Sequence, residues 1–130
     1  MGVYQGNDLR KPSGGLKGRH RKVKRKYELG RYPTETLLEG KEQRNTIRVR
    51  GGNVKVRLVR AVYANVNIPS TGETKKVRII KVLKNPANRD YDRRGIITRG
   101  TLLQTEIGIV RVVSRPGQDG VINAILEEER

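Results

Sequence analysis

The sequence predicts an all-β protein, with a small six- or seven-stranded, barrel-like antiparallel domain behind a basic, largely extended N-terminal extension. Of its 24 Val and Ile residues, 22 lie between Ile47 and Ile125, and β-branched residues favour strands. Many of them alternate with polar residues, which is the period of a half-buried strand. Gly, Pro and Asp separate these runs at short intervals, as is typical of small barrels.

The first strands are predicted on either side of Gly51-Gly52. Residues 47–50 and 54–58 alternate between apolar and cationic side chains, and two such runs around paired glycines indicate a hairpin. The alternation slips at Val59 and Arg60 and resumes over residues 62–68. This slip predicts a β-bulge or a strong bend, which suits a curled sheet.

The second half of the chain predicts further short strands, at residues 74–83, 96–98, 102–105, 107–114 and 121–126. The connections are expected to be a turn at residues 69–72, a polar loop at residues 85–95, a turn at Arg99-Gly100 and two turns within residues 116–120. The glutamates at positions 127–129 are expected to form a solvated acidic tip.

The segment from Arg10 to Lys26 is the most unusual part of the chain. It holds nine cations in seventeen positions, has no carboxylate, and has little apolar content beyond Leu16 and Val23. Too little surface can be buried to offset the entropy of ordering it, so we expect order only on a partner. We therefore divide the chain into a basic N-terminal extension with its connector, residues 1–43, and a β-barrel-like domain, residues 44–130.

The charge predicts a polyanionic partner. The formal net charge is +16, and the first 31 residues carry ten Lys and Arg against two acidic residues. By itself such a run is also compatible with a localisation signal, a solubility tail or a membrane-surface patch. Two features favour a nucleic acid. The run has no carboxylates to pair with its own cations, and the glycines at positions 14, 15 and 18 let the backbone approach phosphates closely. A membrane-surface patch would need a broader apolar face than this run provides.

A second cationic surface is expected on the outer face of the strands, formed by Arg48, Arg50, Lys55, Arg57, Arg78 and Lys81. An ordinary charged sheet surface is the alternative, although few glutamates lie in these strands. Local ion pairs explain the loop cations Arg89, Arg93 and Arg94 as well as phosphate contacts do, because Asp90 and Asp92 lie among them. The residues predicted to bind RNA are Arg10, Lys11, Lys17, Arg19, His20, Arg21, Lys22, Lys24, Arg25, Lys26, Arg31, Arg48, Arg50, Lys55, Arg57, Arg93, Arg94, Arg99 and Arg115.

The composition argues against catalysis and cofactors. The chain has no Cys and one His, so disulfides, thiolate sites and histidine clusters are excluded, and we expect no metal and no cofactor. Asp90 and Asp92 could hold a cation, but the flanking arginines favour ion pairing. No catalytic set is visible, so we expect neither an enzyme nor a small-molecule substrate. No apolar stretch is long enough to span a bilayer or act as a secretion signal, which predicts a cytoplasmic protein without a membrane partner.

The motifs resemble those of a known family. The order Arg10, Ser13-Gly14-Gly15, Arg19-His20-Arg21-Lys22 and Glu28-Leu29-Gly30, followed by the segments 96–101 and 114–120, resembles the archaeal and eukaryotic type of ribosomal protein eight of the small subunit, in its short archaeal form. Ser13 departs from the more usual Thr but keeps the hydroxyl.

The resemblance implies a structural protein that supports subunit assembly and translation. Its partners would be small-subunit ribosomal RNA and neighbouring ribosomal proteins, and it would be a monomer within the subunit. The charge alone leaves a second hypothesis open, a non-ribosomal RNA- or DNA-binding chaperone or ribosome assembly factor.

Overall fold

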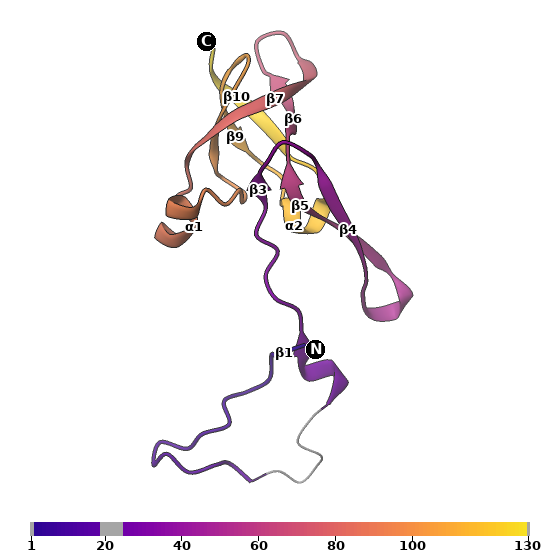
Figure 1. The fold of residues 1–130 in the computed structure, drawn as a ribbon, viewed down its shortest axis with the longest axis vertical. Helices are drawn as coiled ribbons and strands as arrows, with labels where there is room; N and C mark the ends of the chain where they lie inside the picture. The colour runs from indigo at the N-terminus through magenta and orange to yellow at the C-terminus, as the bar shows by residue number, and fades with distance from the viewer. Residues whose placement is uncertain (1, 19–24, 130) are drawn as a thin grey trace. The chain divides into compact units, whose positions relative to one another are not determined.

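The computed structural model describes residues 2–18 and 25–129, and its contacts divide the chain into two compact units, Met1–Pro33 and Thr34–Arg130 (Figure 1). Residues 34–43, which the sequence analysis grouped with the extension and connector, lie in the second unit. Each unit is described by itself below.

The first unit is a long loop whose two ends pair. Strand β1 (Val3–Tyr4) runs antiparallel to β2 (Leu29–Gly30), which follows the 3-10 turn η1 (Lys26–Glu28). Within the loop, a bridge joins Arg10 and Leu16 around a turn in which Gly14 adopts a φ of 87°. No α-helix forms in the described part of the basic run, in agreement with the extended conformation that was predicted.

The second unit is built on a closed barrel of five strands, in the order β10-β6-β7-β8-β9. The strands are β6 (Tyr63–Ile68), β7 (Glu73–Lys84), β8 (Leu102–Thr105), β9 (Gly108–Val112) and β10 (Asn123–Glu129). The all-β class is confirmed. One feature differs from a purely antiparallel barrel, because β6 and β10 pair in parallel and close the sheet.

The barrel interior is aliphatic, since the chain has no Phe or Trp. Alternate residues of each strand point inward, and the fully buried side chains of the core include Leu58, Val66, Ile97, Leu103, Val110, Val112 and Ile122. These side chains fix which residues of each strand face outward, where a ligand can reach them.

A three-stranded sheet accompanies the barrel, in the order β3-β5-β4. It consists of β3 (Leu37–Leu38), β4 (Gln43–Arg48) and β5 (Val54–Ala61), and the turn between β4 and β5 contains η2 (Arg50–Gly52). The predicted hairpin around Gly51-Gly52 is therefore confirmed. Figure 1 shows its tip projecting away from the barrel.

The predicted bulge is also present. Gln43 pairs with Arg60 and Arg44 pairs with Leu58, so Val59 has no partner in the β4–β5 ladder. An extra residue in one strand increases the local twist. The chain then passes through the buried Val62 into β6 of the barrel.

Two predictions in the second half were wrong in part. The expected polar loop at residues 85–95 contains a helix, α1 (Arg89–Arg94), which the side chain of Asn88 caps by accepting a 2.8 Å bond from the Asp90 amide. Gly95, with a φ of 72°, ends it. The expected strand at residues 96–98 is absent. Ile97 only forms an isolated bridge with Thr36, because both isoleucines at 96 and 97 are buried under the barrel instead of lying in its wall.

The C-terminal region also differs from the prediction. The turn residues at 116–119 form a single helical turn, α2 (Pro116–Asp119), with Pro at a position that favours helix initiation. The chain does not end in a separate tip beyond the strands, because β10 continues to Glu129 and its backbone pairs with β9 up to Gly108. Glu127 forms an ion pair with Arg111 at 3.1 Å.

Candidate nucleic-acid interface

The positive charge is shared equally by the two units although their lengths differ. The first 33 residues carry ten Lys and Arg against two acidic residues, a net of +8, and residues 34–130 carry 19 against 11, also +8. The first unit is therefore about three times as densely charged. Each unit by itself therefore attracts polyanions.

The described cations of the first unit are all exposed: Arg10, Lys11, Lys17, Arg25, Lys26 and Arg31. Backbone bonds hold the turn that carries the first three, because Lys11 N donates to Gly15 O at 2.8 Å and Lys17 N donates to Leu9 O at 3.0 Å. The Arg10 guanidinium donates to Gly14 O at 2.9 Å. A carboxylate oxygen, Asp8 Oδ1, also accepts from the Arg10 amide at 3.1 Å, and the three cations leave the turn with an excess of positive charge.

Five predicted site residues, Arg19, His20, Arg21, Lys22 and Lys24, lie outside the described residues.

The β4–β5 hairpin does not carry its cations on a single face, and this part of the prediction was wrong. Residues directly opposite in an antiparallel pair share a face. The register places Lys55 opposite Ile47, whereas Arg48 lies opposite Val54. The alternation within each strand is as predicted, but the length of the connection sets the register, and a shift of one residue moves every side chain to the other face.

Lys55 and Arg57 occupy one face of β5, and among the described residues neither pairs with a carboxylate within 4.0 Å. Lys55 Nζ donates to Gln118 Oε1 of α2 at 2.6 Å, and Arg57 Nη1 donates to Thr34 Oγ1 at 3.2 Å. Arg57 Nε is buried and has no hydrogen-bond partner among the described residues. Neutral partners thus position both cations without cancelling their charge, which is the arrangement that a phosphate-binding surface needs.

Three further predicted residues lie exposed at turns. Arg50 lies at the tip of the hairpin, Arg99 precedes Gly100, and Arg115 precedes α2, where its amide donates to Asp119 Oδ2 at 3.0 Å. Arg48 is also exposed. The turns thus spread these cations around the second unit and do not gather them in one cleft.

Two of the three arginines of α1, Arg93 and Arg94, form ion pairs with carboxylates. Arg93 Nη2 contacts Asp90 Oδ1 at 2.6 Å, and Arg94 bonds both oxygens of Glu35 at 2.8 Å as well as Asp90 Oδ2 at 2.9 Å. The hydrogen bond from Arg94 lowers the pKa of Glu35, and the one from Arg93 lowers the pKa of Asp90. The ion-pair alternative therefore accounts for Arg93 and Arg94, and these are the weakest candidates for phosphate contacts.

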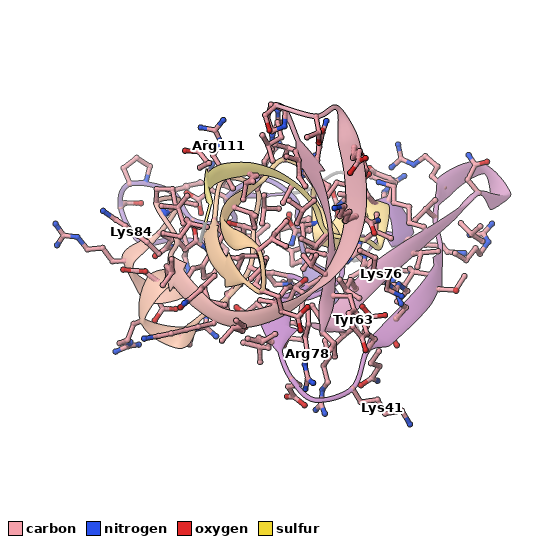
Figure 2. All side chains as sticks on the ribbon, turned by 90° about the horizontal axis from the view of Figure 1, so that it is seen from above. Lys41, Tyr63, Lys76, Arg78, Lys84 and Arg111 are labelled. Carbon is pink, nitrogen blue, oxygen red and sulfur yellow. The ribbon has the colours of Figure 1, made fainter. Side chains whose placement is uncertain are left out.

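The structure brings together a group that the sequence candidates mostly missed, on the outer face of β6 and β7. Tyr63 lies opposite Arg78, and Asn65 lies opposite Lys76. Figure 2 shows Tyr63, Lys76 and Arg78 close together, away from Lys84 and Arg111. Of the three, only Arg78 had been noted. The sequence does contain a signal for this group. Tyr63 and Asn65 before the turn at residues 69–72, and Lys76 and Arg78 after it, each recur at every second position, so they fall on one face when the two strands pair.

The described part of the chain contains neither a metal-binding group of side chains nor a membrane-spanning helix. No group of three His, Cys, Asp or Glu side chains there could hold a metal ion, and Asp92 accepts a 3.0 Å bond from the Asn85 amide while Asp90 pairs with arginine. None of the described helices has the length and apolar character that crossing a membrane requires.

The fold and the charge are those of a small, basic, all-β protein, and comparison with known proteins narrows this class to ribosomal proteins. Residues 4–127 match the family described as ribosomal protein S8e. The chain is 60% identical to the small ribosomal subunit protein eS8 of Hyperthermus butylicus over 130 residues, covering all of this chain and 96% of the relative. It is 59% identical to the protein of the same name from Ignicoccus hospitalis, with both chains fully covered.

A third protein of the same name, from Staphylothermus marinus, is 58% identical to this chain, and the match covers 99% of this chain and the full length of the relative. The chain therefore belongs to the ribosomal protein S8e family, as the motifs had indicated. This is a family of ribosomal proteins and not of enzymes, in agreement with the prediction.

Proposed function

We propose that the chain is a structural constituent of the small ribosomal subunit that binds ribosomal RNA through its basic extension, residues 1–43, and through cations of the β domain, residues 44–130. The observation that carries the proposal is the similarity over the whole chain to proteins named for the small subunit. The expected partners are small-subunit RNA and neighbouring ribosomal proteins, with the chain as a monomer in the cytoplasmic ribosome, where it supports assembly and translation.

The geometry supports phosphate contacts as the main source of affinity. In the exposed turn with Arg10, Lys11 and Lys17, the Arg10 guanidinium donates to a backbone carbonyl, and Lys55 and Arg57 likewise donate to neutral partners. Each cation that neutralises a phosphate releases counterions, so such contacts give affinity with little dependence on sequence. Recognition of particular bases would come from other residues.

The first test measures binding of the full chain to small-subunit RNA across a salt series. If about eight phosphates are neutralised, log affinity falls with log salt at a slope of roughly −6 to −7. Replacing Arg10, Lys11 and Lys17 together by Gln should make the slope shallower by about 2 to 3, because each lost phosphate contact removes roughly one unit.

The matched control replaces Arg60, Lys75 and Arg93 by Gln. It removes the same net charge, but each of these cations is paired with a carboxylate in the structure. We expect it to change the slope by less than one unit. Equal effects of the two triple variants would refute specific contacts by the extension and leave only an effect of net charge.

Sedimentation separates this proposal from the alternative of a transient chaperone or assembly factor. A constituent should remain with the small subunit after a high-salt wash of cell lysate, whereas a transient factor should be released. Release of the chain together with the loosely bound factors would contradict the proposal.

A further inference from the structure

Tyr63 displays its ring on the outer face of the barrel, at the beginning of β6. Its side chain is 41% exposed, and Arg78 of β7 lies directly opposite it. The ammonium of Lys76 stands over the ring, 4.6 Å from its centroid. An exposed aromatic ring on a strand, with two cations from the neighbouring strand beside it, is the arrangement from which many single-strand RNA sites are built.

The residues next to the ring are amides. Asn65, two positions along β6, lies opposite Lys76, and its Nδ2 donates to Asn123 Oδ1 of β10 at 3.2 Å. Asn67 continues the same row. Asparagine side chains both donate and accept hydrogen bonds, so they can contact the polar edge of a base. The outer face of β6 is thus aromatic at one end and amide-lined beyond it.

The carboxylate that contacts this region is already neutralised. Glu42 Oε1 accepts a 3.4 Å bond from the Tyr63 amide, and Glu42 Oε2 pairs with Arg44 at 2.9 Å. Neither Lys76 nor Arg78 forms an ion pair with a carboxylate within 4.0 Å among the described residues. Lys76 acts on the Glu42 carboxylate only at longer range, so both cations can contact an anion from outside the chain, which favours a phosphate-bearing ligand over an apolar protein surface.

We propose that Tyr63 is a stacking platform for an unpaired RNA base, with Lys76 and Arg78 contacting the flanking phosphates and Asn65 contacting the edge of the base. This proposal rests on the proposed RNA-binding function and adds a preference for single-stranded RNA. In the free protein the Lys76 ammonium covers the face of the ring. A phosphate draws this flexible cation outward, and the base takes its place on the ring.

The test compares two RNAs at one salt concentration by fluorescence anisotropy with the full chain: a ten-nucleotide oligoadenylate and a fully paired duplex. Tyr63→Leu keeps an apolar side chain but removes the stacking surface. We expect it to weaken binding of the single strand by about 5- to 150-fold, the loss that accompanies one unstacked base. Binding of the duplex should change by less than about twofold, and Tyr63→Phe should bind both RNAs like the unmodified chain.

The salt dependence separates stacking from charge. Tyr63→Leu should leave the salt slope for the single strand unchanged, whereas Lys76→Gln should make it shallower by about one. The matched control is Tyr91→Leu, which removes another tyrosine that lies under a cation, Arg94, 5.8 Å from the ring centroid. Arg94 is held by carboxylates, so the control should not discriminate between the two RNAs.

Undiminished binding of the single strand by Tyr63→Leu overturns the stacking proposal and leaves the proposed function intact. An equal loss on both RNAs also overturns it, because it would mark a structural role for the ring. If the unmodified chain binds neither of these RNAs nor small-subunit RNA, the proposed function itself fails.

Discussion

At the scale of single residues, Gly120 shows how closely α2 is packed against β5. Its φ is 76°, and an added Cβ would lie 2.8 Å from Val56 Cγ1 and 3.1 Å from the Val56 carbonyl oxygen. The Gly120 carbonyl also accepts a 2.7 Å bond from Arg44 Nε. Gly72 is a useful contrast, because its φ is 73° but nothing lies within 4 Å of its Cβ position.

We predict that Gly120→Ala lowers the free energy of unfolding by about 2 to 4 kcal/mol, since it adds a steric clash to the cost of a left-handed backbone. Gly72→Ala should cost only about 1 kcal/mol, because the backbone term acts alone there. Denaturant unfolding followed by circular dichroism measures both. Equal losses for the two variants would contradict the packing account of α2.

At the scale of elements, ion pairs hold the short helix α1 in place. The Arg94 guanidinium connects Asp90 of the helix with Glu35, which lies just before β3. Because hydrogen bonds to the arginines lower the pKa of both carboxyls in the folded state, the pairs stabilise the helix above the ordinary carboxyl range. Both carboxylates are well solvated, so the effect is local and modest.

We therefore expect α1 to lose protection from hydrogen exchange as the pH falls below about 4, while the barrel strands retain theirs. The sign follows from the lowered pKa values, since protonation of Glu35 and Asp90 is penalised in the folded helix. Arg94→Gln should return the pKa of Glu35, followed by NMR titration, toward its ordinary value. A Glu35 pKa that is the same in this variant would show that the pair does not form in solution.

At the scale of the whole molecule, the net charge of +16 opposes folding. The hydrophobic core that stabilises the folded state against this repulsion is aliphatic and contains no Phe or Trp. A ligand that binds only the folded state stabilises it by mass action. If RNA is that ligand, it also removes part of the self-repulsion.

Saturating small-subunit RNA should thus raise the melting temperature. At a concentration of 100 times Kd, the expected gain is about 2.7 kcal/mol. Thermal melts followed by circular dichroism, with an equal mass of a neutral polymer as the control, measure it. An unchanged melting temperature at saturating RNA would count against coupled folding and binding.

The sequence predicted the strands and the basic extension well because both depend on local patterns. The hairpin at Gly51-Gly52 and the bulge at Val59 follow from alternation and its interruption. It did not predict the face on which Lys55 lies, because register depends on pairing between strands. Helix α1 was missed although Asn88 and Gly95 mark its two ends, since a six-residue helix has too few turns for a periodic signal.

The candidate site was predicted in the same uneven way. The cations of the extension could be selected from the sequence alone, because a high local density of charge is visible without knowledge of the fold. The group around Tyr63 needed the fold, because Lys76 reaches the ring only when β6 and β7 pair in the observed register.

The parallel pairing of β6 with β10 has a consequence for biosynthesis. The barrel closes only when β10 joins β6 and β9, and residues 65 and 123, which pair across this seam, are 58 positions apart. During translation the basic extension therefore leaves the ribosome well before the barrel can close. Until then β6 and β9 each present an unpaired edge, which is a template for aggregation. A nascent chain that stalls before residue 123 would expose its basic N-terminal segment without a completed barrel.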